Sequence, residues 1–120
     1  MKNNRNSAPF HSWAIELLQN DRELAIECLK DALESLDNPE ERGGGLLALR
    51  AVAEAYGGLG AVAAAVGISR ESLYRTLSPK GNPTLKTLVA ILKTVGLRLS
   101  IAEMPKKKAT RAKSRTKRAA

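Results

Sequence analysis

The chain has 120 residues, a length that allows one small domain with appendages. Its hydrophobic content of 43% is enough for a small core, but only 3% of its residues are aromatic, so Leu, Ala, Val and Ile must fill that core. With one cysteine (Cys28) and one histidine (His11), it cannot form an internal disulfide, a metal cluster or a nucleophile–base pair, so we expect no enzyme, no catalytic residues, no metal and no cofactor. No apolar run approaches the roughly 20 residues of a membrane span, and the N-terminus lacks an apolar signal core, so we expect a cytoplasmic protein.

The net charge of +8 is distributed unevenly and divides the chain into four segments. Residues 1–12 are polar and are expected to form a flexible N-terminus. Residues 13–41 form an acidic helical segment, with nine acidic side chains against two basic ones and a net charge of −7. Residues 42–104 carry a net charge of +5, and residues 105–120 hold eight basic side chains and no acidic one. A tail this charged cannot collapse into a core, so it is predicted to be disordered.

The acidic segment is expected to form two helices, the first a short one over residues 13–19. Asn20 has the residue type of an N-cap, and Glu23 three residues later completes a capping box. The second helix is predicted to run to about Leu36, because apolar residues recur at helical spacing. These are Ala25, Cys28, Leu29, Ala32, Leu33 and Leu36.

A third helix is predicted over residues 39–56, with Asn38 as its cap. The glycines Gly43–Gly45 would cost a helix interior roughly 3 kcal/mol relative to alanine. Either the helix breaks there, or another backbone packs closely against it. We favour a continuous or slightly kinked helix, because a clean apolar stripe resumes at Leu46 and lasts until Gly57–Gly58 end the helix.

Residues 59–77 have the pattern of a helix-turn-helix, with helices expected over 59–66 and 69–77. The first helix needs a small residue where the second crosses it, and Ala63 stands there. The turn needs a residue that tolerates a positive φ, and Gly67 does so without steric cost.

The remaining motif positions fit the same pattern. Ile68 is expected to fill the corner between the helices, and Ser69 to cap the second helix through a backbone N–H. Leu73 and Leu77 share one side of that helix and are expected in the core. In DNA-binding versions of the motif the second helix enters the major groove. Two helices joined by a glycine turn also occur in small helical proteins that bind no nucleic acid.

Nine side chains in and after the second helix are the candidate DNA contacts, namely Ser69, Arg70, Glu71, Ser72, Tyr74, Arg75, Lys80, Asn82 and Lys86. Arg70 and Arg75 are the best candidates for base contacts, because a guanidinium fork suits guanine O6 and N7. Glu71 can accept from cytosine N4 or orient Arg75 one turn away. The three hydroxyl-bearing residues suit phosphate oxygens, and the last three residues of the set can hold the flanking backbone. Each of the nine alone is also typical of a solvated surface.

The end of the domain combines a helix with a possible pairing strand. Thr84 is predicted to cap a helix over residues 85–95, which Gly96 ends. The next residues alternate apolar and polar side chains, with Leu97, Leu99 and Ile101 on one side, which is the period of a half-buried β-strand. A single strand lacks a partner in a helical chain, so we expect it to pair with the same strand of a second copy in a two-fold dimer. The alternative is a short extended segment that lies on the body.

From about Leu46 to Leu99 the chain resembles the Cro/repressor-like (XRE-type) helix-turn-helix family, and more narrowly the HigA-type antitoxins, the antidote proteins of bacterial addiction modules. The resemblance rests on LLALRAVAEAYGG at 46–58, AAAVGISRESLYRTLS at 63–78 and KGNPTLKTLVAILKTVGLRLSI at 80–101. The run SRESLYRTLS followed by GNPTL is typical of that subgroup. Two features depart from the family: Leu59–Ala61 stand where other members often have a phosphate-contacting Gln, and the chain ends in a basic tail.

The resemblance implies an all-α fold, a small lambda-repressor-like helix-turn-helix domain, to which the sequence adds a short C-terminal β-strand and a disordered basic tail. It also implies a function: a DNA-binding antitoxin of a type II toxin–antitoxin module, which binds its double-stranded operator as a homodimer, represses its own operon and neutralises a RelE/HigB-like toxin. Such toxins are small basic ribonucleases, so the acidic segment 13–41 is the candidate toxin surface, although it is equally typical of a solvated helix face. A stand-alone helix-turn-helix transcriptional regulator and a basic-tailed architectural protein remain alternatives. Each would be nucleoid-associated in the cytoplasm.

Overall fold

The computed structural model describes the backbone of residues 4–105 and the side chains of residues 12–105. Within this part the chain is all-helical. Its helices are α1 (Asn4–Asn20), α2 (Arg22–Ser35), α3 (Arg42–Ala55), α4 (Gly58–Val66), α5 (Arg70–Thr76) and α6 (Leu85–Thr94). The predicted basic tail, residues 106–120, lies outside the described residues.

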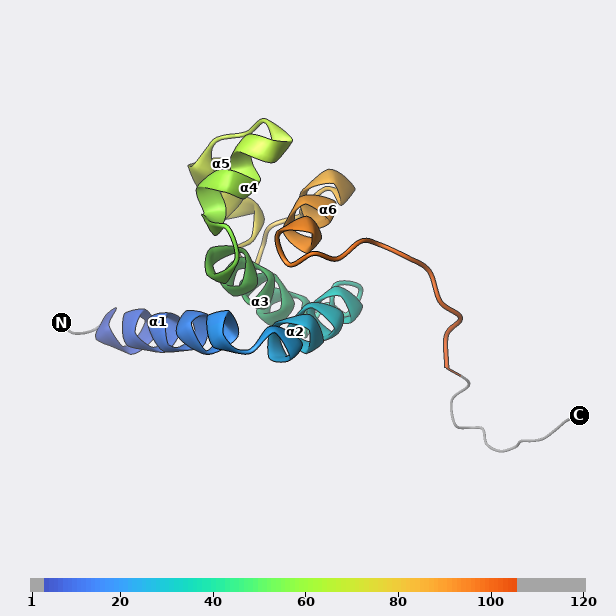
Figure 1. The fold of residues 1–120 in the computed structure, drawn as a ribbon, viewed down its shortest axis with the longest axis horizontal. Helices are drawn as coiled ribbons and strands as arrows, with labels where there is room; N and C mark the ends of the chain where they lie inside the picture. The colour runs from blue at the N-terminus through green and yellow to red at the C-terminus, as the bar shows by residue number, and fades with distance from the viewer. Residues whose placement is uncertain (1–3, 106–120) are drawn as a thin grey trace, which may run out of the picture.

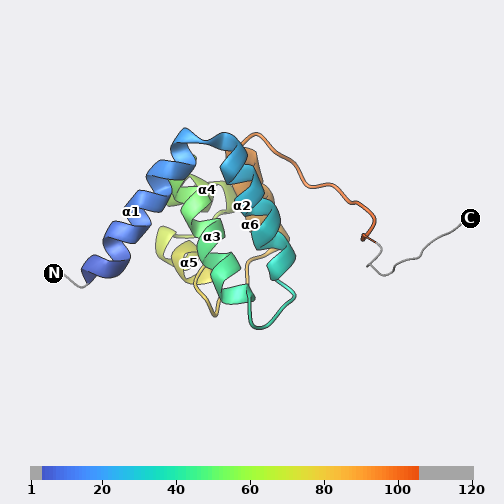
Figure 2. The same ribbon diagram turned by 90° about the horizontal axis from the view of Figure 1, so that it is seen from below.

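Helix α3 lies in the middle of the fold. On one side it packs against α1 and α2, and on the other against α4 and α6, while α5 packs on α4 (Figure 1). The view in Figure 2, turned by 90°, shows α1 and α2 flanking α3. Residues 97–105 leave the end of α6 and run away from the helices in both views. The α4–α5 pair and the acidic α2 therefore lie on opposite sides of α3.

The core is aliphatic, as the composition predicts. The largest fully buried side chains come from every helix between α2 and α6 and from the residue after α5; they are Leu29, Leu46, Leu49, Val52, Leu59, Val62, Leu73, Leu77 and Ile91. Helix α3 contributes buried residues around most of its circumference, which explains its central position. No single described helix is long and apolar enough to cross a membrane; α3 and α4 together pass by length and composition, but they bend by 103° at their junction.

The predicted stripe of α2 is confirmed, but its cap lies one residue later than predicted. Ala25, Leu29 and Ala32 are buried on α2. Asn20 is the last residue of α1, and it is Asp21, with extended backbone, whose carboxylate accepts a hydrogen bond from the Leu24 N–H at 3.0 Å. Helix α1 itself begins at Asn4, upstream of the predicted start at residue 13.

The third helix also begins later than predicted, at Arg42. The Asn38 side chain accepts a hydrogen bond from the Glu40 N–H at 2.9 Å, which closes a turn over the residues that were expected in the first turn of the helix. Gly43–Gly45 lie inside α3 and do not break it. The second explanation offered for them, a close backbone, holds at Gly45: a Cβ there would meet the Ser35 hydroxyl and would lie 3.0 Å from the Ala32 carbonyl oxygen, both on α2.

The residues that begin and end α6 match the prediction, whereas the predicted β-strand is not seen. The Thr84 hydroxyl caps α6 by accepting from the Thr87 N–H at 3.1 Å, and Gly96 after the helix has a φ of +83°. No strand is assigned to residues 97–101 or elsewhere in the described part of the chain. The physical reason is that a lone strand has no neighbour here with which to form a ladder.

Substitution of two neighbouring glycines tests the close packing of α2 on α3. Gly45→Ala is expected to lower the free energy of unfolding by about 1–3 kcal/mol, because the new methyl group displaces the Ser35 hydroxyl and presses on the α2 backbone. Gly44→Ala is the matched control: its Cβ meets nothing within 4 Å, so helix propensity should raise the stability by up to about 1 kcal/mol. Urea unfolding followed by circular dichroism measures both. Equal stabilisation by the two substitutions would contradict the close contact.

Candidate nucleic-acid interface

The two helices expected at residues 59–77 are present as α4 and α5, and a three-residue turn joins them. Gly67 adopts the left-handed conformation with φ +80°, and its N–H caps α4 by donating to the Ala63 carbonyl at 2.9 Å. Ala63 is 2% exposed, as its predicted place at the helix crossing requires. Ile68, which was expected to fill the corner between the helices, is 38% exposed and therefore only partly buried.

The orientation of α5 follows from its buried residues. Leu73 and the following Leu77 are fully buried, as predicted, and fix which side of the helix faces the core. Because successive residues turn by about 100° around a helix, Arg75 and Glu71 point away from that side. Arg70 and Arg75 are both exposed. The outward face of α5 therefore presents the Arg75 guanidinium and the Glu71 carboxylate to solvent, while Arg70 is exposed at the beginning of the helix.

A short chain of hydrogen bonds organises the beginning of α5. The Ser69 hydroxyl accepts from the Ser72 N–H at 3.0 Å, which confirms it as the cap, and it also lies 3.0 Å from the Ser72 hydroxyl. The Arg75 Nη2 donates to the Ser72 hydroxyl at 3.5 Å. Within the described residues, Arg75 is therefore oriented by Ser72. This role was expected of Glu71 as one of two alternatives.

Tyr74 has a partner that the sequence analysis missed. The Arg50 guanidinium of α3 lies over the Tyr74 ring, 4.0 Å from its centroid, in a cation–π contact. The ring stays 49% exposed. The only signal in the sequence was one basic residue on an otherwise apolar stretch of α3. A single basic residue does not indicate which side chain it contacts.

The turn after α5 is held by another arginine that sequence reasoning missed. Arg42, the first residue of α3, donates from Nη1 to the Leu36 carbonyl at 2.7 Å and from Nη2 to the Gly81 carbonyl at 2.9 Å. Its Nη2 also lies 3.0 Å from Oδ1 of Asn82, so this predicted DNA contact already has a structural role in the turn. Lys80 in the same turn is exposed.

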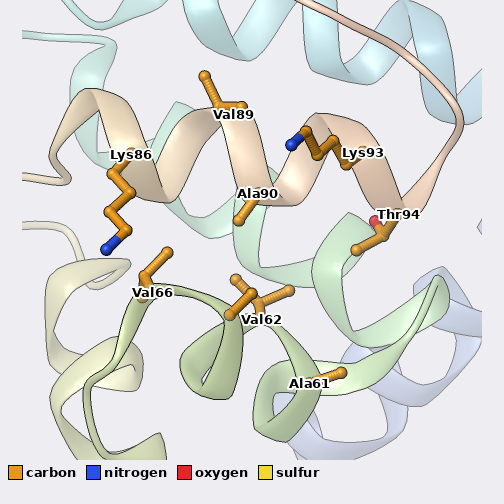
Figure 3. A pocket seen from close by; sticks show the side chains of 9 residues that line it. Ala61, Val62, Val66, Lys86, Val89, Ala90, Lys93 and Thr94 are labelled. Atoms are coloured by element: carbon orange, nitrogen blue, oxygen red, sulfur yellow. The ribbon is translucent and has the colours of Figure 1, made fainter.

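Lys86, the last of the nine predicted contacts, lines a pocket between α4 and α6. The pocket has a volume of about 340 Å³ and is mostly apolar, with Lys86 and Lys93 at its edge (Figure 3). The Lys86 side chain extends from α6 toward Val66 at the end of α4. The structure thus places seven of the nine residues on α5 or in the turn that follows it, adds Ser69 as the cap of α5, and puts Lys86 on α6.

The three residues of the predicted pairing strand become progressively more exposed along the chain. Leu97 is half-buried against the core, and its N–H donates to the Leu92 carbonyl at 2.9 Å. Leu99 is 41% exposed and Ile101 is 97% exposed. Two apolar side chains of this segment are therefore left on the surface of a single copy.

The acidic residues gather on the opposite side of the molecule, on α2 and the turn after it. Glu27, Asp31 and Glu34 are exposed along one face of α2.

Burial raises the pKa of the Cys28 thiol, and the neighbouring charges of Asp31 and Glu27 raise it further, which keeps this thiol protonated. Arg22 is engaged elsewhere, since its Nε and Nη2 donate to the Val95 carbonyl at 3.2 and 2.9 Å. The described residues contain no group of three His, Cys, Asp or Glu side chains that could hold a metal ion.

Comparison with known proteins finds one relative that matches part of the chain and one family that matches most of it. The chain is 40% identical, over 42 residues, to an uncharacterized protein of Haemophilus influenzae (strain ATCC 51907 / DSM 11121 / KW20 / Rd), a match that covers 35% of this chain and 43% of that protein. The chain thus matches less than half of the length of this relative. No solved structure matches it significantly. The family described as "Probable addiction module antidote protein" matches residues 11–103, which include all six helices except the beginning of α1, and the chain belongs to that family.

Proposed function

We propose that this protein is the DNA-binding antitoxin of a type II toxin–antitoxin module, which represses its own operon and neutralises a RelE/HigB-like toxin. The observation that carries the proposal is the division of the molecule into a basic α5 face and an acidic α2 face on opposite sides of α3, in a chain of the antidote family. An antidote must engage a toxin, and an autorepressor must engage an operator. Two separate surfaces allow one chain to do both without a catalytic site.

For DNA binding, we propose that α4 and α5 form an XRE-type helix-turn-helix with α5 as the recognition helix. The exposed Arg70 and Arg75 are the base-contacting residues, since each guanidinium can donate two parallel hydrogen bonds to guanine in the major groove. Ser69, Ser72 and Tyr74, together with Lys80 in the following turn, are suited to phosphate oxygens. Glu71 and Asn82 complete this interface, and Lys86 contributes from α6.

Arg75→Ala tests the proposed recognition helix. The loss of the guanidinium should weaken binding by about 1–3 kcal/mol at one operator base pair and relax the preference there, while the other positions keep theirs. Binding-site selection with random duplexes measures the preference of both proteins. Ser78→Ala, in the turn after α5, is a control that should leave the preference unchanged. An unaltered base preference in Arg75→Ala would remove this residue from the base-contacting set.

For toxin binding, we propose the exposed acidic face of α2 as the docking surface for a small basic protein. The segment 13–41 has a net charge of −7, and the residues that carry the charge on α2 are exposed. Complementary charge of this kind accelerates association and selects the partner more than it adds affinity. We propose a RelE/HigB-like ribonuclease as this partner, because such toxins are small and basic and an antidote must neutralise a toxin.

Reversal of one charge on α2 tests this docking surface. With the product of a small basic reading frame beside this gene as the probe, Asp31→Lys should slow association several-fold at low salt, and the difference should shrink at high salt. Glu103→Lys, the same charge change on an exposed residue of the C-terminal segment, is the control and should have little effect. Stopped-flow mixing measures the rates. If both variants slow association equally, net charge alone acts and the α2 face is not the docking surface. If no such reading frame lies beside the gene, a stand-alone transcriptional regulator becomes the better interpretation.

For assembly, we propose a two-fold homodimer in which the segment Leu97–Ile101 pairs with its copy as a β-strand. Leu99 and Ile101 are exposed in one copy, and pairing would cover both while completing the backbone hydrogen bonds of the strand. Two recognition helices would then meet half-sites about 34 Å apart, which a single motif cannot do.

The eight basic residues of the tail would add affinity that does not depend on sequence. Such a protein would reside with the nucleoid in the cytoplasm.

Leu99→Pro tests the pairing strand, because proline removes a ladder N–H and distorts the strand. The dimer and operator binding should weaken together. Glu103→Pro, which lies beyond the proposed strand, is the control and should dimerise like the original protein. Analytical ultracentrifugation at micromolar concentration reports the assembly. A monomeric original protein, or a Leu99→Pro variant that dimerises equally well, would refute strand pairing.

A further inference from the structure

The contact between Arg50 and Tyr74 joins two helices whose residues lie far apart in the sequence. Arg50 belongs to α3, the central helix, and Tyr74 belongs to α5. The guanidinium carbon lies over the ring, 4.0 Å from its centre, so the two groups are in direct contact. Arg50 is half-buried and the ring is 49% exposed, so the pair sits at the surface of the protein and not in its core.

The pair lies on the flank of the outward face of α5. Tyr74 precedes Arg75, so the two side chains are separated by about 100° around the helix axis. Leu73, the residue before, is fully buried and marks the side of α5 that faces the core. Tyr74 therefore stands between the buried side of α5 and the side that carries Arg75, next to α3. A rod lying along the outward face of α5 would pass the Arg50–Tyr74 pair at its edge.

The chemistry of the pair suits an anion. Within the part of the chain that the structure describes, no ion pair joins Arg50 to a carboxylate. A guanidinium stacked on a ring keeps its N–H groups in its own plane, where they point outward past the rim of the ring. The ring holds the group in place and lowers the conformational entropy that binding would cost. The exposed edge is thus a set of preorganised donors for a phosphate oxygen.

We infer that Arg50 and Tyr74 form one composite phosphate clamp, which holds the DNA sugar–phosphate backbone beside the recognition helix and extends the interface from the α4–α5 motif to α3. The inference rests on the proposed DNA-binding function. Arg50 supplies the charge and the donors, and Tyr74 is a positioning residue that fixes the guanidinium. The clamp contacts no base edge, so it adds affinity and sets the position of α5 without adding sequence preference.

Salt dependence distinguishes a phosphate clamp from a structural contact. The full chain is titrated against a duplex of its preferred sequence and against a scrambled duplex over a range of salt concentrations. Arg50→Gln should weaken binding to both duplexes by the same factor, about tenfold at low salt, and should reduce the slope of log K against log salt by about 0.9, the contribution of one phosphate contact. Lys30→Gln is the matched control, since it removes the charge of an exposed basic residue on α2, on the opposite side of α3 from α5. It should leave the slope near its original value.

Two further variants separate charge from positioning. Arg50→Lys keeps the charge and should keep the slope, but it should bind several-fold more weakly, because an ammonium group lacks the planar fork that stacks on the ring. Tyr74→Ala should weaken binding to both duplexes in the protein with Arg50, and should do so much less in the Arg50→Gln background. This non-additivity is the signature of a unit.

Each outcome decides between the possibilities. A slope in Arg50→Gln equal to that of the original protein would overturn the clamp while leaving the proposed DNA binding intact. A change of sequence preference in Arg50→Gln would also overturn it, because Arg50 would then contact a base. An original protein that binds neither duplex would refute the proposed function itself. If Arg50→Gln fails to fold by circular dichroism, Tyr74→Ala and Arg50→Lys decide instead: weaker binding to both duplexes by the same factor supports the clamp, and unchanged binding overturns it.

Discussion

The packing of α3 against its neighbours determines where the two proposed binding surfaces lie. Its buried residues face α2 on one side and α4 and α6 on the other, so this helix is shared by both halves of the molecule. The close approach at Gly45 brings the α2 backbone against α3, where a larger residue would hold it away. Arg42 at the beginning of α3 ties the turn before it to the turn after α5. A single helix thus positions the acidic α2 and the basic α5 relative to each other.

This arrangement separates opposite charges by the width of a helical layer. The acidic residues of α2 are exposed, as are Arg70 and Arg75 of α5, and the two helices lie on opposite sides of α3 (Figure 1). If the charges were mixed on one surface, the carboxylates of α2 would repel a DNA backbone that approached α5. The separation allows the proposed toxin and the proposed operator to be bound by the same chain. It also accounts for a chain with a charge of +8 that carries a strongly acidic segment.

The elements that the sequence predicts well depend on local chemistry. Helical spacing of apolar residues indicated α2 and the α4–α5 pair, and capping residues such as Ser69, Thr84 and Gly67 act within one turn of the chain, where spacing is visible. Two errors in the predicted helix boundaries also concern capping residues. Asn20 and Asp21 are both good caps, and only the end of α1 decides between them. Asn38 was expected to start a helix but closes a turn, and Arg42 donates to the Leu36 carbonyl just before that turn.

The contacts that the sequence did not predict join distant residues. Arg50 contacts Tyr74, and Arg42 contacts Asn82, only because the fold brings these side chains of α3 to α5 and its following turn. Neither residue of a pair indicates the other from the sequence. The predicted strand at residues 97–101 requires a second copy, so one chain cannot display it. The sequence therefore indicated the outward residues of α5 but not the side chains that hold them.

The most direct test of the two-surface arrangement is nuclear magnetic resonance mapping of the full chain on addition of a duplex from the region upstream of its own gene. The amide signals of residues 69–75 and the side-chain signal of Arg50 should shift as the duplex is added, while the amides of α2 should stay in place. Shifts confined to α1 and α2, or to residues 106–120 alone, would contradict α5 as the DNA-binding helix.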